Sequence, residues 1–172
     1  MRLERRLQAF NDARDTLLDE MANLDPGVLV ARPLAGKWSI LEIIEHLVLA
    51  ERAVFQGLPD PSRLAGNARG LGHRVRYLLV MCVLTSGIRV RVPTPAMVPR
   101  GGCSLAELRR LWDENQAWLI ACIDRLGPNG IRNAVLQHPV AGPMSVEQAV
   151  KLDQVHVNRH VRQIKVLQRL LG

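Results

Sequence analysis

Two histidines, His156 and His160, lie four residues apart near the C-terminal end of the chain. Apolar residues recur around them at the spacing of a helix face, and at about 100° per residue both imidazoles fall inside that apolar stripe. Side chains four apart on a helix are neighbours, with Cβ atoms roughly 5–6 Å apart, so both rings can approach one point. A metal ion with bonds of about 2.0–2.1 Å would suit this pair. The alternative is two core histidines, each hydrogen-bonded to a carbonyl or a carboxylate.

A third histidine, His46, lies at the edge of another predicted helix. Ser39 followed three residues later by Glu42 is a capping box, which predicts that this helix starts at Ser39. His46 falls beside the apolar stripe of the helix, where a side chain can reach sideways into a bundle interior. Three histidine ligands would leave positions open for water or substrate, as catalytic rather than structural zinc sites do.

Two carboxylates accompany the histidines as candidate catalytic residues. Asp153 precedes His156 by three residues on the same helix face, so it can accept the free N–H of a ligating imidazole, or contact the metal or a bound water. A surface aspartate beside basic neighbours is an equally good interpretation of Asp153. Glu42 lies one turn before His46 and is the weaker candidate, because it already caps its helix.

The other two histidines carry less weight. His138 precedes a proline, which biases its backbone to extended conformations in a loop that can fold over the site. It can line the pocket, support a ligand or anchor the loop. His73 lies among arginines, and we assign it no role.

Four helices are expected to position these residues. The chain has 172 residues, 48% of them hydrophobic, and little strand-like alternation, which predicts one all-α domain over residues 1–172. The expected helices span about 3–22, 39–56, 104–126 and 145–170, the last two also beginning at capping boxes. Four helices of this length predict a four-helix bundle. A long crossover between the second and third helices carries an apolar run at 77–84 that predicts an extra helical segment.

Two blocks of the sequence resemble the signature regions of the DinB-like (DinB/YfiT-like) superfamily of bacterial metalloenzymes. The blocks are Trp38-Ser39-x-x-Glu42-x-x-x-His46-Leu47 and His156-x-x-Arg159-His160-x-x-Gln163-Ile164. The stretch that begins His138-Pro139-x-x-Gly142 resembles the family's lead-in to its last helix. The resemblance implies a four-helix bundle with a long connection, and a divalent metal bound by His46, His156 and His160.

The resemblance also implies a chemistry. Similar superfamily members include metal-dependent transferases that use low-molecular-weight thiols such as bacillithiol or mycothiol, and a thiol-dependent maleylpyruvate isomerase. A metal held by three neutral imidazoles keeps its charge, so it can lower the pKa of a bound water toward about 7 or activate a thiolate. We expect a metal-dependent thiol S-transferase or hydrolase with a small-molecule substrate and, for the first type, a thiol cosubstrate. Imidazole ligands suit zinc, nickel and iron alike. The alternative is a non-catalytic stress-response or binding protein with a structural metal.

Positive charge is concentrated in one segment. The chain has a net charge of +7, and most of it comes from residues 57–103, which contain seven arginines and one acid, Asp60. Such a segment can attract nucleic acid, anionic lipid or an acidic cosubstrate. Nucleic acid binding is not expected, because Tyr77 is its only aromatic residue. Its apolar run predicts a helix packed on the bundle, with a dimer contact or a membrane-surface element as alternatives, and we expect a homodimer.

Several features point to a cytoplasmic location. The three cysteines, Cys82, Cys103 and Cys122, form no C-x-x-C pair, which favours reduced thiols. The N-terminal residues lead into an amphipathic helix without the apolar region of a signal peptide. The longest apolar run, 77–84, falls short of the ~20 residues that span a bilayer.

Overall fold

The computed structural model of the chain describes residues 2–33, 36–55, 70–88, 92, 94–133 and 136–171. Its elements in chain order are α1 (Arg2–Ala22), α2 (Pro26–Val30), α3 (Ile40–Phe55), α4 (Leu71–Ser86), the 3-10 helix η2 (Pro95–Met97), α5 (Leu105–Arg132), β1 (Leu136–His138), β2 (Gly142–Met144) and α6 (Val146–Leu171). The predicted all-α class is confirmed, since only a two-stranded hairpin departs from it within the described residues. No helix in those residues is long and apolar enough to cross a membrane.

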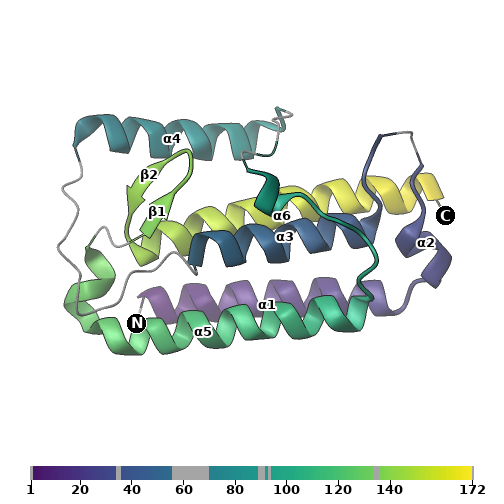
Figure 1. Cartoon of the computed structure of the whole chain (residues 1–172), viewed down its shortest axis with the longest axis horizontal. Helices are drawn as coiled ribbons and strands as arrows, with labels where there is room; N and C mark the ends of the chain where they lie inside the picture. Colours follow the sequence, from purple (N-terminus) through teal and green to yellow (C-terminus); the bar gives the residue numbers. More distant parts are fainter. Residues whose placement is uncertain are drawn as a thin grey trace.

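The four long helices α1, α3, α5 and α6 form the predicted bundle. Both α1 and α3 pack against α5 and α6. Figure 1 shows that α3 and α5 run in the same direction along the molecule, opposite to α1 and α6. Parallel neighbours cannot be joined by a tight turn, so the chain has to return along the bundle between them. The helix α4 lies in that return, on the outside of the bundle against α6, which confirms the extra helix predicted in the crossover.

Capping boxes fix where three of these helices begin. At the start of α3, the backbone N–H of Glu42 donates to Ser39 Oγ, and the N–H of Ser39 donates to Glu42 Oε2 over 2.8 Å. This exchange satisfies two of the backbone donors that a helix start leaves without partners. The same reciprocal bonds join two further pairs: Ser104 with Glu107, and Ser145 with Gln148.

The structure differs from the sequence prediction after residue 126. The helix was expected to end there, and Gly127 does break it, with φ 61° and ψ 179°. The chain then turns helical again to Arg132, because Pro128 is pre-organised for the first turn of a helix. The hairpin β1–β2 was not predicted either, since strands of three residues are too short to show alternation.

Two hydrophobic clusters fill the interior. One surrounds Trp112 of α5, and the other surrounds Phe55 of α3 beneath the hairpin and α4. The inner face of α4 packs on the second cluster through four partly buried residues: Tyr77, Val80, Met81 and Leu84. The apolar run 77–84 is therefore a helix packed on the bundle, as the leading interpretation predicted.

Candidate metal centre

Three imidazoles meet between α3 and α6. The Nε2 atom of His156 lies 3.3 Å from Nε2 of His46 and 3.1 Å from Nε2 of His160. One ring nitrogen of each residue lies within 4.8 Å of the other two, so the group could hold a metal ion. Two nitrogens bound tetrahedrally at about 2.0–2.1 Å are about 3.3 Å apart, which is close to the spacing observed. The histidines predicted from their sequence spacing are thus brought together from two helices.

In His46 and His160, a hydrogen bond at Nδ1 leaves Nε2 available as a metal ligand. His46 Nδ1 lies 2.7 Å from the carbonyl oxygen of Met97, and His160 Nδ1 lies 3.0 Å from Gln163 Oε1. Both partners can only accept, so each Nδ1 carries the proton and each Nε2 presents a lone pair to the centre. His156 has one ring proton at most to direct at these two lone pairs. A shared cation therefore accounts for the cluster better than hydrogen bonds between the rings.

Burial keeps the three imidazoles neutral. It lowers the pKa of His160 to about 4, with a further contribution from the nearby His46. It lowers the pKa of His156 well below its ordinary value, and the other two histidines add to that shift. The pKa of His46 is also lowered by burial, against the bond to Met97 that raises it. Neutral rings at pH 7 are what metal ligation requires.

The connection after η2 is tied to α3 beside His46. Besides the bond from His46 to Met97, the backbone N–H groups of Arg100 and Gly101 donate to the two carboxylate oxygens of Glu45 over 3.0 and 2.9 Å. Met97 was not foreseen, because a carbonyl that orients a ligand leaves no side-chain signature in the sequence. Gln163 could have been found, since it stands three residues after His160 on the same helix.

Asp153 is buried one turn before His156, beside Glu51 of α3. Trp112 and Gln116 of α5 donate to the two carboxylate oxygens of Glu51. Burial raises the pKa of Asp153 to about 7, although a hydrogen bond with Glu51 acts to lower it. Burial, followed by the charge of Asp153, raises the pKa of Glu51 well above its usual range.

These two carboxyl groups cannot both be ionised at low cost, so they share a proton at neutral pH. The surface interpretation of Asp153 is wrong, because the residue is 8% exposed. The sequence analysis did not single out Glu51. The sequence feature that could have revealed Glu51 is its position four residues after Leu47, which puts it on the core face of α3.

Glu42 is held by contacts at the start of α3. Besides its capping bond with Ser39, it accepts hydrogen bonds from the guanidinium of Arg32, one of them 2.9 Å long. The bond to Arg32 is the main cause that lowers the pKa of Glu42, so the carboxylate is ionised. Its capping role is confirmed, and its catalytic role stays a prediction.

His138 and His73 lie outside the cluster. His138 Nδ1 accepts hydrogen bonds from the backbone N–H groups of Val140 and Ala141, which anchors the hairpin turn. Burial lowers the pKa of His138 to about 4, so it too is neutral. His73 Nδ1 accepts a hydrogen bond from the N–H of Gly70 at the start of α4.

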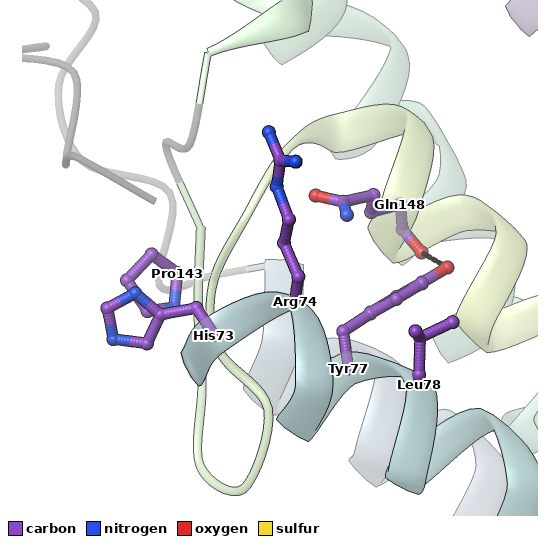
Figure 2. Close-up of a pocket in the computed structure, with 6 residues that line it drawn as sticks. All are labelled: His73, Arg74, Tyr77, Leu78, Pro143 and Gln148. Carbon is purple, nitrogen blue, oxygen red and sulfur yellow. Dashed lines mark hydrogen bonds between the residues drawn. The ribbon is translucent and has the colours of Figure 1, made fainter. Parts of the chain in front are cut away.

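A cavity of about 460 Å³ opens beside α4, away from the three histidines. The hydroxyl of Tyr77 points across it and donates to the carbonyl oxygen of Gln148 over 3.4 Å, as Figure 2 shows. The cavity has six lining residues: His73, Arg74, Tyr77, Leu78, Pro143 and Gln148.

Arg159, between the two histidines of α6, reaches outward to α4. Its guanidinium donates to the carbonyl oxygens of Val83 over 2.8 Å, Leu84 over 3.5 Å and Ile88. A cation at the C-terminal end of a helix satisfies carbonyls that have no helical partner. The signature block of α6 therefore supplies both histidines and the contact that fastens α4.

A helical bundle with a three-histidine cluster between two of its helices defines a class of proteins equipped to hold a metal ion. The model of the DinB superfamily matches residues 9–164. The chain therefore belongs to the DinB superfamily, as the resemblance predicted. No significant match was found among curated proteins or among solved structures.

Proposed function

We propose that this protein is a metal-dependent enzyme that acts on a small-molecule substrate, with a divalent metal held by His46, His156 and His160. The observation that carries the proposal is the convergence of three neutral Nε2 atoms, 3.1 and 3.3 Å apart for the two measured pairs. Hydrogen bonds to Met97 and Gln163 hold two of the rings in the ligating tautomer. Three protein ligands would leave coordination positions for substrate or water.

The bound metal would supply the positive charge that stabilises a thiolate or a hydroxide at neutral pH. Asp153 is proposed to hold or pass on a proton, because its carboxyl group has a pKa of about 7 and lies one turn from His156. Glu42 is proposed to orient the site through α3, since Arg32 and Ser39 occupy its oxygens. The reaction class is thiol S-transfer or hydrolysis, with a low-molecular-weight thiol as cosubstrate in the first case and zinc, nickel or iron as the metal.

We also propose a cytoplasmic enzyme that does not bind nucleic acid. Reduced thiols fit this location, and none of the three cysteines forms a disulfide. A homodimer stays a proposal. The run 77–84 now supports it less, because half of that run packs α4 onto the bundle.

The first experiment measures bound metal in protein purified without an affinity tag. We expect about one divalent ion per chain in the wild type, none in His156→Ala, and an unchanged content in His73→Ala, a control outside the cluster. Failure of the wild type to bind zinc, nickel or iron on titration would contradict the metal site.

Thermal melting then separates catalysis from a structural metal, which is the second candidate because the cluster joins α3 to α6. A His156→Ala protein that melts close to the wild type supports catalysis, whereas a large loss of stability supports a structural role. A screen of thiol transfer to electrophilic substrates completes the test. Activity that survives complete chelation would rule out the metal-dependent mechanism.

A further inference from the structure

The helix α4 is apolar on both of its faces, and the described residues of the chain cover only one of them. Its inner face packs on the bundle, whereas the apolar residues of its other face are exposed: Leu71 by 78%, Val75 by 49%, Leu79 by 59%, Cys82, and Leu78 by 60% at the edge that borders the cavity. We call these five residues the outer stripe. A helix that is apolar all round is normally buried on all sides. The outer stripe therefore indicates a surface that something else covers.

Arginines border the outer stripe. At about 100° per residue, Arg74 and Arg76 fall on its opposite flanks. The sequence from 61 to 106 contains no Asp or Glu, so no acidic side chain of that stretch offsets its arginines. An apolar stripe flanked by cations is the pattern of a helix that lies in the surface of an anionic membrane.

The position of α4 suits contact with a plane. Figure 1 shows it as an outer layer along the long axis of the molecule, on the side of α6 away from α1 and α5. Arg159 fastens its C-terminal end to α6. Among the described residues, α4 is therefore the layer that a flat surface on that side of the molecule would meet first.

We propose that α4 binds the surface of anionic lipid membranes, with the outer stripe inserted at the level of the headgroups and Arg74 and Arg76 at lipid phosphates. Long arginine side chains can bury their stems beside apolar surface while their charged ends stay at the phosphates. This function goes beyond the proposed enzyme, because none of these residues belongs to the histidine cluster.

Charge favours this partner over a second copy of the chain. Arginines stand before and within the first turns of α4, at 69, 74 and 76, and shortly after its end, at 89 and 91. Two copies packed through their outer stripes would each add Arg74 and Arg76 at the edges of the interface, and the sequence from 61 to 106 offers no Asp or Glu to offset them. An anionic surface attracts the same charges, with a contribution that salt screens.

Vesicle co-sedimentation of the full chain tests the proposal. We expect at least about tenfold stronger partitioning to vesicles with about a third phosphatidylglycerol than to pure phosphatidylcholine, and a steep loss as salt rises from about 0.1 to 0.5 M. The double variant Leu71→Gln/Leu79→Gln should bind about tenfold more weakly, because it removes apolar area from the stripe without changing charge. Arg74→Gln/Arg76→Gln should show a similar loss.

Two matched variants serve as controls. Val30→Gln/Leu170→Gln removes two side chains that are each 61% exposed elsewhere, and Lys165→Gln/Arg169→Gln removes two exposed charges of α6. Both should bind vesicles like the wild type. The proposal is overturned if the wild type ignores anionic vesicles, or if the stripe variants bind as well as the controls. It is also overturned if light scattering finds a dimer that Leu71→Gln/Leu79→Gln dissociates while vesicles are not bound.

Discussion

Asp153 and Glu51 bring two carboxyl groups together in the bundle interior, one turn from a candidate metal ligand. Replacing a buried ionisable pair with apolar residues commonly leaves stability unchanged or improves it, so such a pair is weak evidence of a stabilising role. Perturbed carboxyl groups beside a cluster of potential ligands are instead candidates for proton transfer. Trp112 and Gln116 donate to both oxygens of Glu51, so Asp153 is the partner that we expect to carry the shared proton.

The raised pKa of Asp153 predicts how stability depends on pH. Its folded value of about 7 lies above the ordinary 3.8, so the folded state holds a proton that the unfolded chain releases between these values. The stabilisation is complete below pH ~4 and is lost as the pH rises through about 7. Relative to the wild type, Asp153→Asn should gain roughly 1–3 kcal/mol in unfolding free energy between pH 4 and 8. Urea unfolding in the presence of a chelator measures this difference.

The control is Asp124→Asn, which removes an exposed carboxylate of α5. If the difference in unfolding free energy between Asp153→Asn and the wild type is the same at pH 4 and pH 8, Asp153 and Glu51 do not share a proton.

Side-chain spacing is the part of the site that the sequence could reveal. His156 and His160 are neighbours on one helix, so their separation follows from helical geometry. The position of His46 at the edge of an apolar stripe made it a candidate, but the sequence alone does not say which helix it faces, and the family resemblance supplied that partner. The carbonyl of Met97 could not be predicted, since its position depends on how η2 folds back onto α3.

At the scale of single elements, helix starts were predictable and short or irregular pieces were not. The capping box of α3 depends on only two side chains, Ser39 and Glu42, and the structure has it at the expected residues. The hairpin depends instead on contacts across its turn, where His138 accepts two backbone N–H groups. Local sequence signals do not encode such contacts.

The attachment of α4 gives a prediction at this scale. Arg159→Met should remove the donors to the carbonyls of Val83 and Ile88 and lower the free energy of local opening at the C-terminal end of α4 by about 1–2 kcal/mol. The loss should be local, so hydrogen exchange should become faster in the C-terminal turns of α4 and stay unchanged in the middle of α5. Exchange followed by mass spectrometry distinguishes these segments.

Arg162→Met, an exposed site on the same helix, is the matched control for loss of charge. Equal exchange of α4 in both variants would mean that Arg159 does not hold its end.

At the scale of the whole molecule, the order of the helices explains how the site is assembled. Because α3 and α5 are parallel, the chain between them travels the length of the bundle and places α4 outside α6 and η2 against α3. The same connection therefore supplies the outer stripe and the carbonyl that orients His46. His46 and His156 stand 110 residues apart in sequence, on helices that the bundle brings together.

A metal that joins α3 to α6 should stabilise the whole fold by mass action. Above the dissociation constant, each tenfold rise in free metal should add about 1.4 kcal/mol to the unfolding free energy, less any binding to the unfolded chain. His46→Gln should weaken this dependence strongly, because it removes the only candidate ligand of the cluster that α3 supplies, while an amide can still donate to Met97. Chemical unfolding over a series of buffered metal concentrations measures both slopes. Identical slopes for the two proteins would place the metal on α6 alone, and the link between the helices would be wrong.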